Sequence, residues 1–240
     1  MPNKELKTTC LVLRAADYRD SDKMLTLFSR EYGKLSALAR GAKKGKLKFA
    51  VQPMFTGEFL LESKAGKLYV SQAQQLKSYF TIASDFSKFA SANVILECTE
   101  IFLTDEPAPK LFALSVNCLE KLKNDISPAE VLAYFSVKLL CISGYEPHLD
   151  GCACCGSEGQ EYFSFEHGGG ICGDCKANSD IHLSKDMILL INKSKKLAPI
   201  SFELSGFKQQ TFEQVYNIML KFIEHICEQK LKSTVIFKFG

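Results

Sequence analysis

The hydrophobic pattern of this chain changes its period near residue 80, and that change constrains the fold more than any other feature. Before it, short apolar runs alternate with polar residues, which is typical of β-strands. Five short strands are too few for two packed sheets, so we predict a closed five-stranded OB-fold barrel over residues 1–79. The strands are expected at 8–15, 24–30, 35–41, 54–63 and 66–74, with tight turns at 31–34 and 64–66.

Beyond residue 80 the apolar residues recur at the spacing of an α-helix. Ser84 or Asp85 is expected to cap the first helix, and Ser127, with Glu130 three residues later, is expected to cap the third. The predicted fold class is therefore α+β, with a helical domain at 80–240 after the barrel. Its helices are expected at 84–106, 109–124, 127–144, 183–196 and 210–231.

Two cysteine pairs interrupt the helical pattern, each with two residues between its members. The pairs are Cys152 with Cys155 and Cys172 with Cys175, and sixteen residues separate them, which is typical of zinc sites. Four thiolates complete a tetrahedral shell and leave no open position for water. We therefore predict a structural Zn²⁺ held by these four residues in a zinc-finger insertion at 146–178.

Cys154 is a fifth cysteine in this segment, and it breaks the two-residue spacing with either neighbour. We expect it to be unbound, with its use in place of Cys155 as the alternative. His148 and His167 flank the pairs and are expected at the surface, with a role as substitute ligands as the alternative. The remaining cysteines are expected to be free thiols in the core: Cys10, Cys98, Cys118, Cys141 and Cys227.

The cysteines and the N-terminus also indicate a compartment. Ten cysteines in a chain whose first residues lack the apolar core of a signal peptide favour reducing surroundings, so we expect a cytoplasmic protein. No apolar run reaches the ~18 residues of a membrane span. The sequence contains no H-E-x-x-H, P-loop, G-x-S-x-G or zinc-deaminase motif, so we expect no catalytic residues.

Positive charge is concentrated in the first part of the chain. Residues 1–79 contain 15 lysines and arginines against 7 aspartates and glutamates, whereas residues 80–240 contain 15 against 20. The densest stretch, ARGAKKGKLK at 39–48, has five cations and no acid. Because such a run repels itself, it indicates an anionic partner, with a solvated loop as the alternative.

The cations of the barrel are candidates for phosphate contacts, and neighbouring aromatic side chains are candidates for stacking on bases. Phe49 is an equally good candidate for the core. The expected contact residues are Arg19, Arg40, Lys43, Lys44, Lys46 and Lys48, with Arg14, Arg30 and Lys34 in second rank, and the stacking candidates are Tyr18, Tyr32, Phe49 and Tyr69.

The run from Arg19 to Lys44 and the pattern C-x2-C-G…G-G-x-x-C-x2-C resemble the RecO family of DNA repair and recombination mediators. The likeness runs nearly the full length and also includes QPMFTGEFLL and GYEPHLD. One departure follows the basic segment, where the family usually has a Lys-Ser-Arg-like triplet. This chain has Lys46-Leu47-Lys48 there, which keeps the charge but lacks a guanidinium.

The resemblance implies a non-catalytic protein that binds single- and double-stranded DNA and anneals complementary strands. It implies action on DNA coated by single-strand-binding protein, through the C-terminal tail of that protein, and work with RecR to load RecA. It implies no cofactor beyond the zinc, and a place in the cytoplasm at the nucleoid. The residues leave other functions open: a zinc module that binds RNA or acts in transcription, a metalloenzyme, and a scaffold whose basic lobe docks an acidic protein.

Overall fold

The computed structural model describes residues 5–45, 47–200, 202 and 204–235. The chain forms two compact units, Met1–Lys123 and Asn124–Gly240, and the first combines the barrel with two helices. The sequence-based division at residue 79 stays a prediction.

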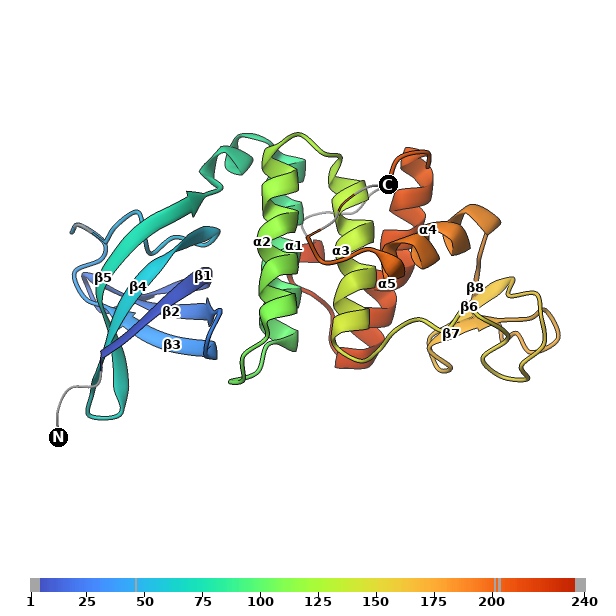
Figure 1. The fold of residues 1–240 in the computed structure, drawn as a ribbon, viewed down its shortest axis with the longest axis horizontal. Coiled ribbons are helices and arrows are strands. Elements are labelled where there is room, and N and C mark those ends of the chain that lie inside the picture. The colour runs from blue at the N-terminus through green and yellow to red at the C-terminus, as the bar shows by residue number, and fades with distance from the viewer. Residues whose placement is uncertain (1–4, 46, 201, 203, 236–240) are drawn as a thin grey trace. The chain divides into compact units, whose positions relative to one another are not determined.

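The first unit begins with a closed five-stranded barrel, as the sequence predicted (Figure 1). Its strands neighbour one another in the order β1-β2-β3-β5-β4, and β4 closes the barrel by pairing with β1. All neighbours are antiparallel except β3 and β5, which are parallel over a short register. The strands are β1 (Glu5–Tyr18), β2 (Asp22–Ser29), β3 (Gly33–Ala39), β4 (Phe55–Lys64) and β5 (Lys67–Ser78).

The alternation along each strand decides which residues fill the barrel. Leu25 and Leu27 of β2 point inward and are fully buried, whereas Phe28 points outward and packs edge-on against Phe112, with ring centroids 5.2 Å apart. Residues of the basic loop also join the core, because Ala42 lies against it. The rest of the barrel core consists of Cys10, Val12, Ala37, Ala39, Ala50, Val51, Phe55, Phe59, Leu61 and Val70.

Two helices complete the first unit, α1 (Phe86–Phe102) and α2 (Pro109–Lys123), and the short 3-10 helix η1 (Phe80–Ser84) leads into them. The Asp85 side chain accepts a hydrogen bond from the Lys88 amide at 3.0 Å, so the predicted cap of α1 is confirmed. The start of β3 contacts the segment after α1, where the Lys34 amide donates to the Thr104 carbonyl at 2.8 Å.

The second unit contains α3 (Pro128–Ile142), α4 (Lys185–Lys196) and α5 (Gln209–Cys227), and α3 packs against both of the others. A small three-stranded sheet, in the order β7-β6-β8, lies between α3 and α4 in the chain (Figure 1). None of the helices within the described residues is long and apolar enough to span a bilayer. The sheet strands are β6 (Tyr162–Ser164), β7 (Gly169–Ile171) and β8 (Ile181–His182), and η2 (Ser233–Val235) follows α5.

The helical prediction differs from the structure in some details. Ser127 is the N-cap residue of α3, as predicted, but its side chain makes no capping hydrogen bond, because its hydroxyl donates instead to Gln209 Oε1 at 2.8 Å. Helix α1 ends at Phe102 rather than residue 106. Helix α5 ends at Cys227 rather than residue 231, since Glu228 takes a left-handed conformation with φ of 52°. Among the predicted core thiols, Cys10, Cys98 and Cys118 are buried, whereas Cys141 and Cys227 are only partly buried.

Two glycines in tight turns of the barrel allow a matched stability test. Gly33 has φ of +68°, and a Cβ there would lie 2.3 Å from the Glu106 carbonyl oxygen, whereas Gly66 has φ of +74° and open space around it. We expect Gly66→Ala to lower the free energy of unfolding by about 1–2 kcal/mol, the cost of the left-handed backbone. Gly33→Ala should cost about 3 kcal/mol or more, since the overlap adds to that cost.

Urea denaturation of both variants measures the difference. Equal losses would show that the turn between β2 and β3 moves freely away from the segment after α1.

Candidate nucleic-acid interface and metal centre

A pocket of ≈ 450 Å³ lies on the outer surface of the barrel, over β2 and β3. Its floor includes Met24 and Leu38, which are partners in the β2–β3 register and face outward there. The turn between β1 and β2 contributes Arg19, and the turn between β4 and β5 contributes Gly66. Segments far apart in the chain therefore border one pocket, on the face that OB-folds use for oligonucleotides.

Two guanidinium groups lie at this pocket above aromatic rings. The Arg40 Cζ is 4.5 Å from the centroid of the Tyr69 ring, and the Arg19 Cζ is 5.3 Å from that of Tyr18. Both arginines are exposed, and neither forms an ion pair with a carboxylate in the described part of the chain. Planar cations held on rings can contact both phosphates and bases.

One carboxylate also lines the pocket, that of Asp22. Its Oδ1 accepts hydrogen bonds from the Gly41 amide at 2.9 Å and from the Ser21 hydroxyl at 3.0 Å. The Gly41 bond is the main cause that lowers the pKa of Asp22, and the nearby charges of Arg40 and Arg19 act in the same direction. The contact is thus present at neutral pH and is lost only as the pH falls through the lowered pKa.

The basic segment is partly neutralised by its own lobe. Lys43 Nζ lies 3.2 Å from Asp17 Oδ2 and donates to the Arg19 carbonyl at 3.4 Å, so its charge has a partner that the sequence run did not show. Lys44 and Lys48 are exposed. Lys46 lies outside the described residues.

The second-rank cations lie away from the pocket. Arg14 and Lys34 both approach Glu100 of α1, at 3.3 and 3.6 Å, and Arg30 is exposed at the turn between β2 and β3. Of the predicted contact residues within the described chain, the pocket brings together Arg19 and Arg40. The contact set as a whole stays a prediction.

The aromatic candidates divide in the same way. Tyr18 and Tyr69 line the pocket, whereas Tyr32 does not, and Phe49 is 68% exposed, so its interpretation as a core residue is wrong. Sequence reasoning missed the pocket floor and Asp22. The alternation along β2 and β3 could have indicated the floor, because it leaves apolar side chains on the outer face of both strands.

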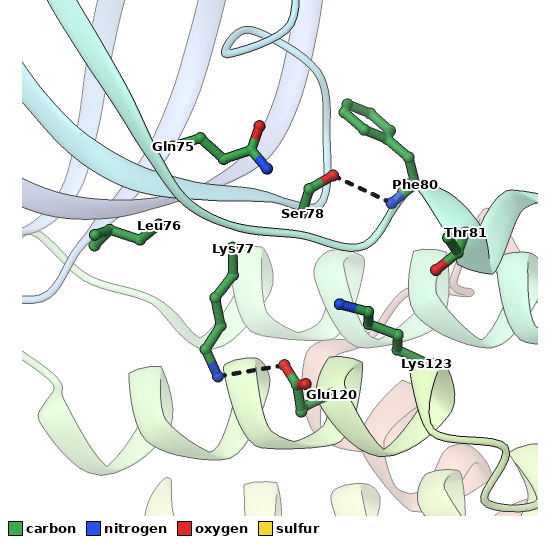
Figure 2. Close-up of a pocket in the computed structure, with 8 residues that line it drawn as sticks. All are labelled: Gln75, Leu76, Lys77, Ser78, Phe80, Thr81, Glu120 and Lys123. Carbon is green, nitrogen blue, oxygen red and sulfur yellow. Dashed lines mark hydrogen bonds and ion pairs between the residues drawn. The ribbon is translucent and has the colours of Figure 1, made fainter.

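A second pocket, of ≈ 410 Å³, lies where β5 leads into η1 beside α2 (Figure 2). Leu76 and Phe80 are 54% and 42% exposed there. Lys77 Nζ lies 3.3 Å from Glu120 Oε2 and connects the end of β5 to α2 (Figure 2). This pocket contains none of the predicted nucleic-acid-binding residues, whereas Arg19 and Arg40 line the pocket over β2 and β3.

The second unit brings four of the clustered cysteines together. The sulfurs of Cys152, Cys155, Cys172 and Cys175 all lie within 4.8 Å of one another, and those of Cys155 and Cys172 are 3.7 Å apart. Four sulfurs at ~2.3 Å from a central zinc would be ~3.8 Å apart, so the cluster fits a tetrahedral metal site. Cys154 is exposed and outside this group.

Backbone amides stabilise thiolates in this cluster. The Cys155 amide is the main cause that lowers the pKa of Cys152 to about 6, and the Cys172 amide adds a bond of 3.3 Å to its sulfur. The pKa of Cys172 is lowered as well, chiefly by the Ser157 hydroxyl. That of Cys175 is raised, because the sulfurs of Cys155 and Cys172 accept its proton. A bound cation would replace this proton and neutralise the thiolates.

A glycine-rich hairpin closes the cluster. The strands β6 and β7 form an antiparallel hairpin, and a Cβ on Gly169 would lie 2.4 Å from the His148 carbonyl oxygen, so only glycine fits. Phe163 of β6 packs against Phe222 of α5, with centroids 5.3 Å apart. His148 and His167 are exposed and do not join the sulfur group, as expected.

Comparisons with known proteins identify the same family in both parts of the chain. The family described as Recombination protein O N terminal matches residues 1–79, and Recombination protein O C terminal matches residues 83–234. Proteins named DNA repair protein RecO from Caldanaerobacter subterraneus subsp. tengcongensis and Bacillus pumilus are each 35% identical over 71% of this chain, and over 71% and 68% of their own lengths. That of Clostridium novyi is 28% identical over 97% of this chain and 93% of its own.

The Asp22 contact predicts which substitution loosens the basic loop. Asp22→Ala removes the acceptor of the Gly41 amide, so hydrogen exchange at Gly41 should be faster by about five-fold or more. Asp22→Asn keeps a carbonyl oxygen there and should change exchange less. Amide exchange measured by NMR checks this, and identical exchange in both variants and the parent would contradict it.

Proposed function

Because the chain belongs to the RecO family of DNA repair and recombination proteins, we propose that it is a non-catalytic mediator that binds single- and double-stranded DNA. It promotes annealing of complementary strands, and with RecR it helps to load RecA onto strands coated by single-strand-binding protein. The barrel binds the DNA, and the helical region binds partners, including the acidic, apolar tail of the single-strand-binding protein. It works in the cytoplasm, at the nucleoid.

The observation that carries this proposal is the pair of guanidinium groups at the barrel pocket. Arg19 and Arg40 form no ion pair with a carboxylate in the described chain, and each guanidinium lies over a tyrosine ring. Such groups neutralise phosphates, and the rings beside them offer stacking surfaces to unpaired bases. Lys44 and Lys48 extend the positive surface along the loop that follows β3.

Annealing needs no bond to be made or broken. Two single strands repel each other through their phosphates, and a cationic surface that neutralises phosphates on both lowers this repulsion. It also raises the local concentration of each strand. Because phosphate contacts carry no sequence information, complementarity is read by base pairing between the strands. The side chains of the barrel thus hold DNA but do not select the pairs.

We also propose that the metal of the sulfur cluster is Zn²⁺. Four sulfurs in tetrahedral reach of one point suit zinc, and four protein ligands leave no position for a reacting water. When bound, the ion neutralises the thiolates and links the two Cys-x-x-Cys turns. The backbone amides around Cys152 and Cys172 orient the sulfurs of these residues toward the site.

The charge of the barrel predicts a salt-dependent affinity. If about four to six phosphates are neutralised, log K for single-stranded DNA should fall with log[salt] at a slope of about −3 to −4. Arg19→Glu/Arg40→Glu should weaken binding of all sequences and reduce the slope by ~0.7 for each phosphate that is no longer neutralised. The annealing rate of complementary oligonucleotides should fall in parallel. Fluorescence anisotropy and a quenching assay measure these quantities.

A control with the same change of net charge is Lys196→Glu/Lys221→Glu, on exposed positions of α4 and α5. It should retain both the slope and the annealing rate. A flat salt response, or annealing at the parental rate by the arginine variant, would refute the proposed role of the barrel.

The sulfur cluster predicts a metal-dependent segment. The protein purified without chelator should carry one zinc per chain, because four thiolates bind one tetrahedral ion. Cys172→Ser should lose the metal and unfold residues 146–178, since metal binding is coupled to folding in such segments. Cys154→Ser is the matched control and should keep the metal. Native mass spectrometry and thermal unfolding test this, and metal-free parental protein would count against the site.

A further inference from the structure

We propose that the barrel pocket accepts one unstacked base of single-stranded DNA, and that Asp22 favours bases with an exocyclic amino group. This inference rests on the proposed function, because it concerns the DNA that the barrel binds. It adds a base preference to a surface whose other contacts are to phosphates.

The size and lining of the pocket suit a base. Its ≈ 450 Å³ falls in the range of small-molecule sites, and Met24 and Leu38 give it an apolar floor. The Tyr18 and Tyr69 rings, with the guanidinium groups above them, provide flat surfaces at its border. A flat aromatic ring gains from such surroundings, whereas a hydrated phosphate does not.

The position of Asp22 argues against a phosphate in the same place. Its carboxylate lines the pocket, and a phosphate there would meet a like charge. The hydrogen bond from Gly41 lowers the pKa of Asp22, so the group stays ionised at neutral pH. An ionised carboxylate only accepts hydrogen bonds, so the ligand group that faces it must be an N–H or O–H donor.

One oxygen of this carboxylate is available. The hydrogen bonds from the Gly41 amide and the Ser21 hydroxyl both end on Oδ1. Within the described residues Oδ2 has no partner. The two bonds fix the carboxylate and leave Oδ2 to accept a hydrogen bond from a ligand. Asp22 can therefore hold the loop and recognise a ligand at the same time.

The bases differ in what they offer to such an oxygen. Cytosine, adenine and guanine carry an exocyclic amino group, and cytosine presents its N4 donor at the base edge. Uracil and thymine have a carbonyl oxygen at that position, and their ring N–H lies between two carbonyl oxygens that a carboxylate repels. The preference should therefore be clearest between cytosine and uracil, which are alike in size and stacking surface.

The test compares binding of oligo-dC and oligo-dU to the full chain by anisotropy at one salt concentration. The parent should bind oligo-dC about three- to ten-fold more tightly, below the discrimination of a bidentate base contact. Oligo-dC with N4,N4-dimethylated bases should bind like oligo-dU, because it lacks the donor.

Asp22→Asn should bind both oligonucleotides more tightly, since a negative charge near Arg19 and Arg40 is removed, and should bring their affinities to within about two-fold of each other. Asp20→Asn is the matched control. It makes the same charge change in the same turn, at an exposed residue that does not line the pocket, and should keep the preference.

The outcomes separate this inference from the proposed function. Equal affinity of the parent for oligo-dC and oligo-dU, with a steep salt dependence, would overturn the base preference and leave DNA binding in place. A preference that survives in Asp22→Asn or with dimethylated cytosine would overturn the assignment to Asp22. Failure to bind either oligonucleotide at low salt would overturn both proposals. Because the dimethylated probe uses the parent, the test holds even if Asp22→Asn does not fold.

Discussion

Closure of the barrel is the constraint on which the rest of the first unit depends. The β1–β4 ladder runs from Glu5 opposite Glu62 to Leu11 opposite Thr56, and the parallel pairing of β3 with β5 completes the ring. A closed sheet leaves few unpaired strand edges, so its surface can be used for binding rather than for strand addition. The same closure brings the turn at Arg19 and the turn at Gly66 to one pocket.

Acidic residues on either side of the turn between β1 and β2 organise the positive charge of the barrel. Asp17 pairs with Lys43, and Asp22 accepts from the Gly41 amide, so both hold the loop that carries the basic segment. The repulsion expected within that segment is thereby reduced locally. Arg19 and Arg40 have no such carboxylate partner in the described chain and lie at the pocket. The negative charge of a bound anionic chain can therefore neutralise them there.

The sulfur cluster of the second unit also brings groups of like charge close together. Each Cys-x-x-Cys turn directs amides toward its own sulfurs, but the two turns meet only because the β6–β7 hairpin returns the chain at Gly169. Phe163 connects this hairpin to α5 through Phe222. A cation at the centre would remove the repulsion between thiolates and would thereby stabilise the small sheet.

The sequence by itself determined the barrel, most helix positions and the four sulfurs, because local alternation, helical spacing and paired cysteines are properties of neighbouring residues. It also ranked Arg19 and Arg40 above Arg14 and Lys34, but it could not show that Arg14, Lys34 and Lys43 have carboxylate partners. Only the tertiary structure decided that, since ion pairs with Glu100 and Asp17 join residues distant in sequence. The base-facing role proposed for Asp22 likewise depends on contacts that no local pattern encodes.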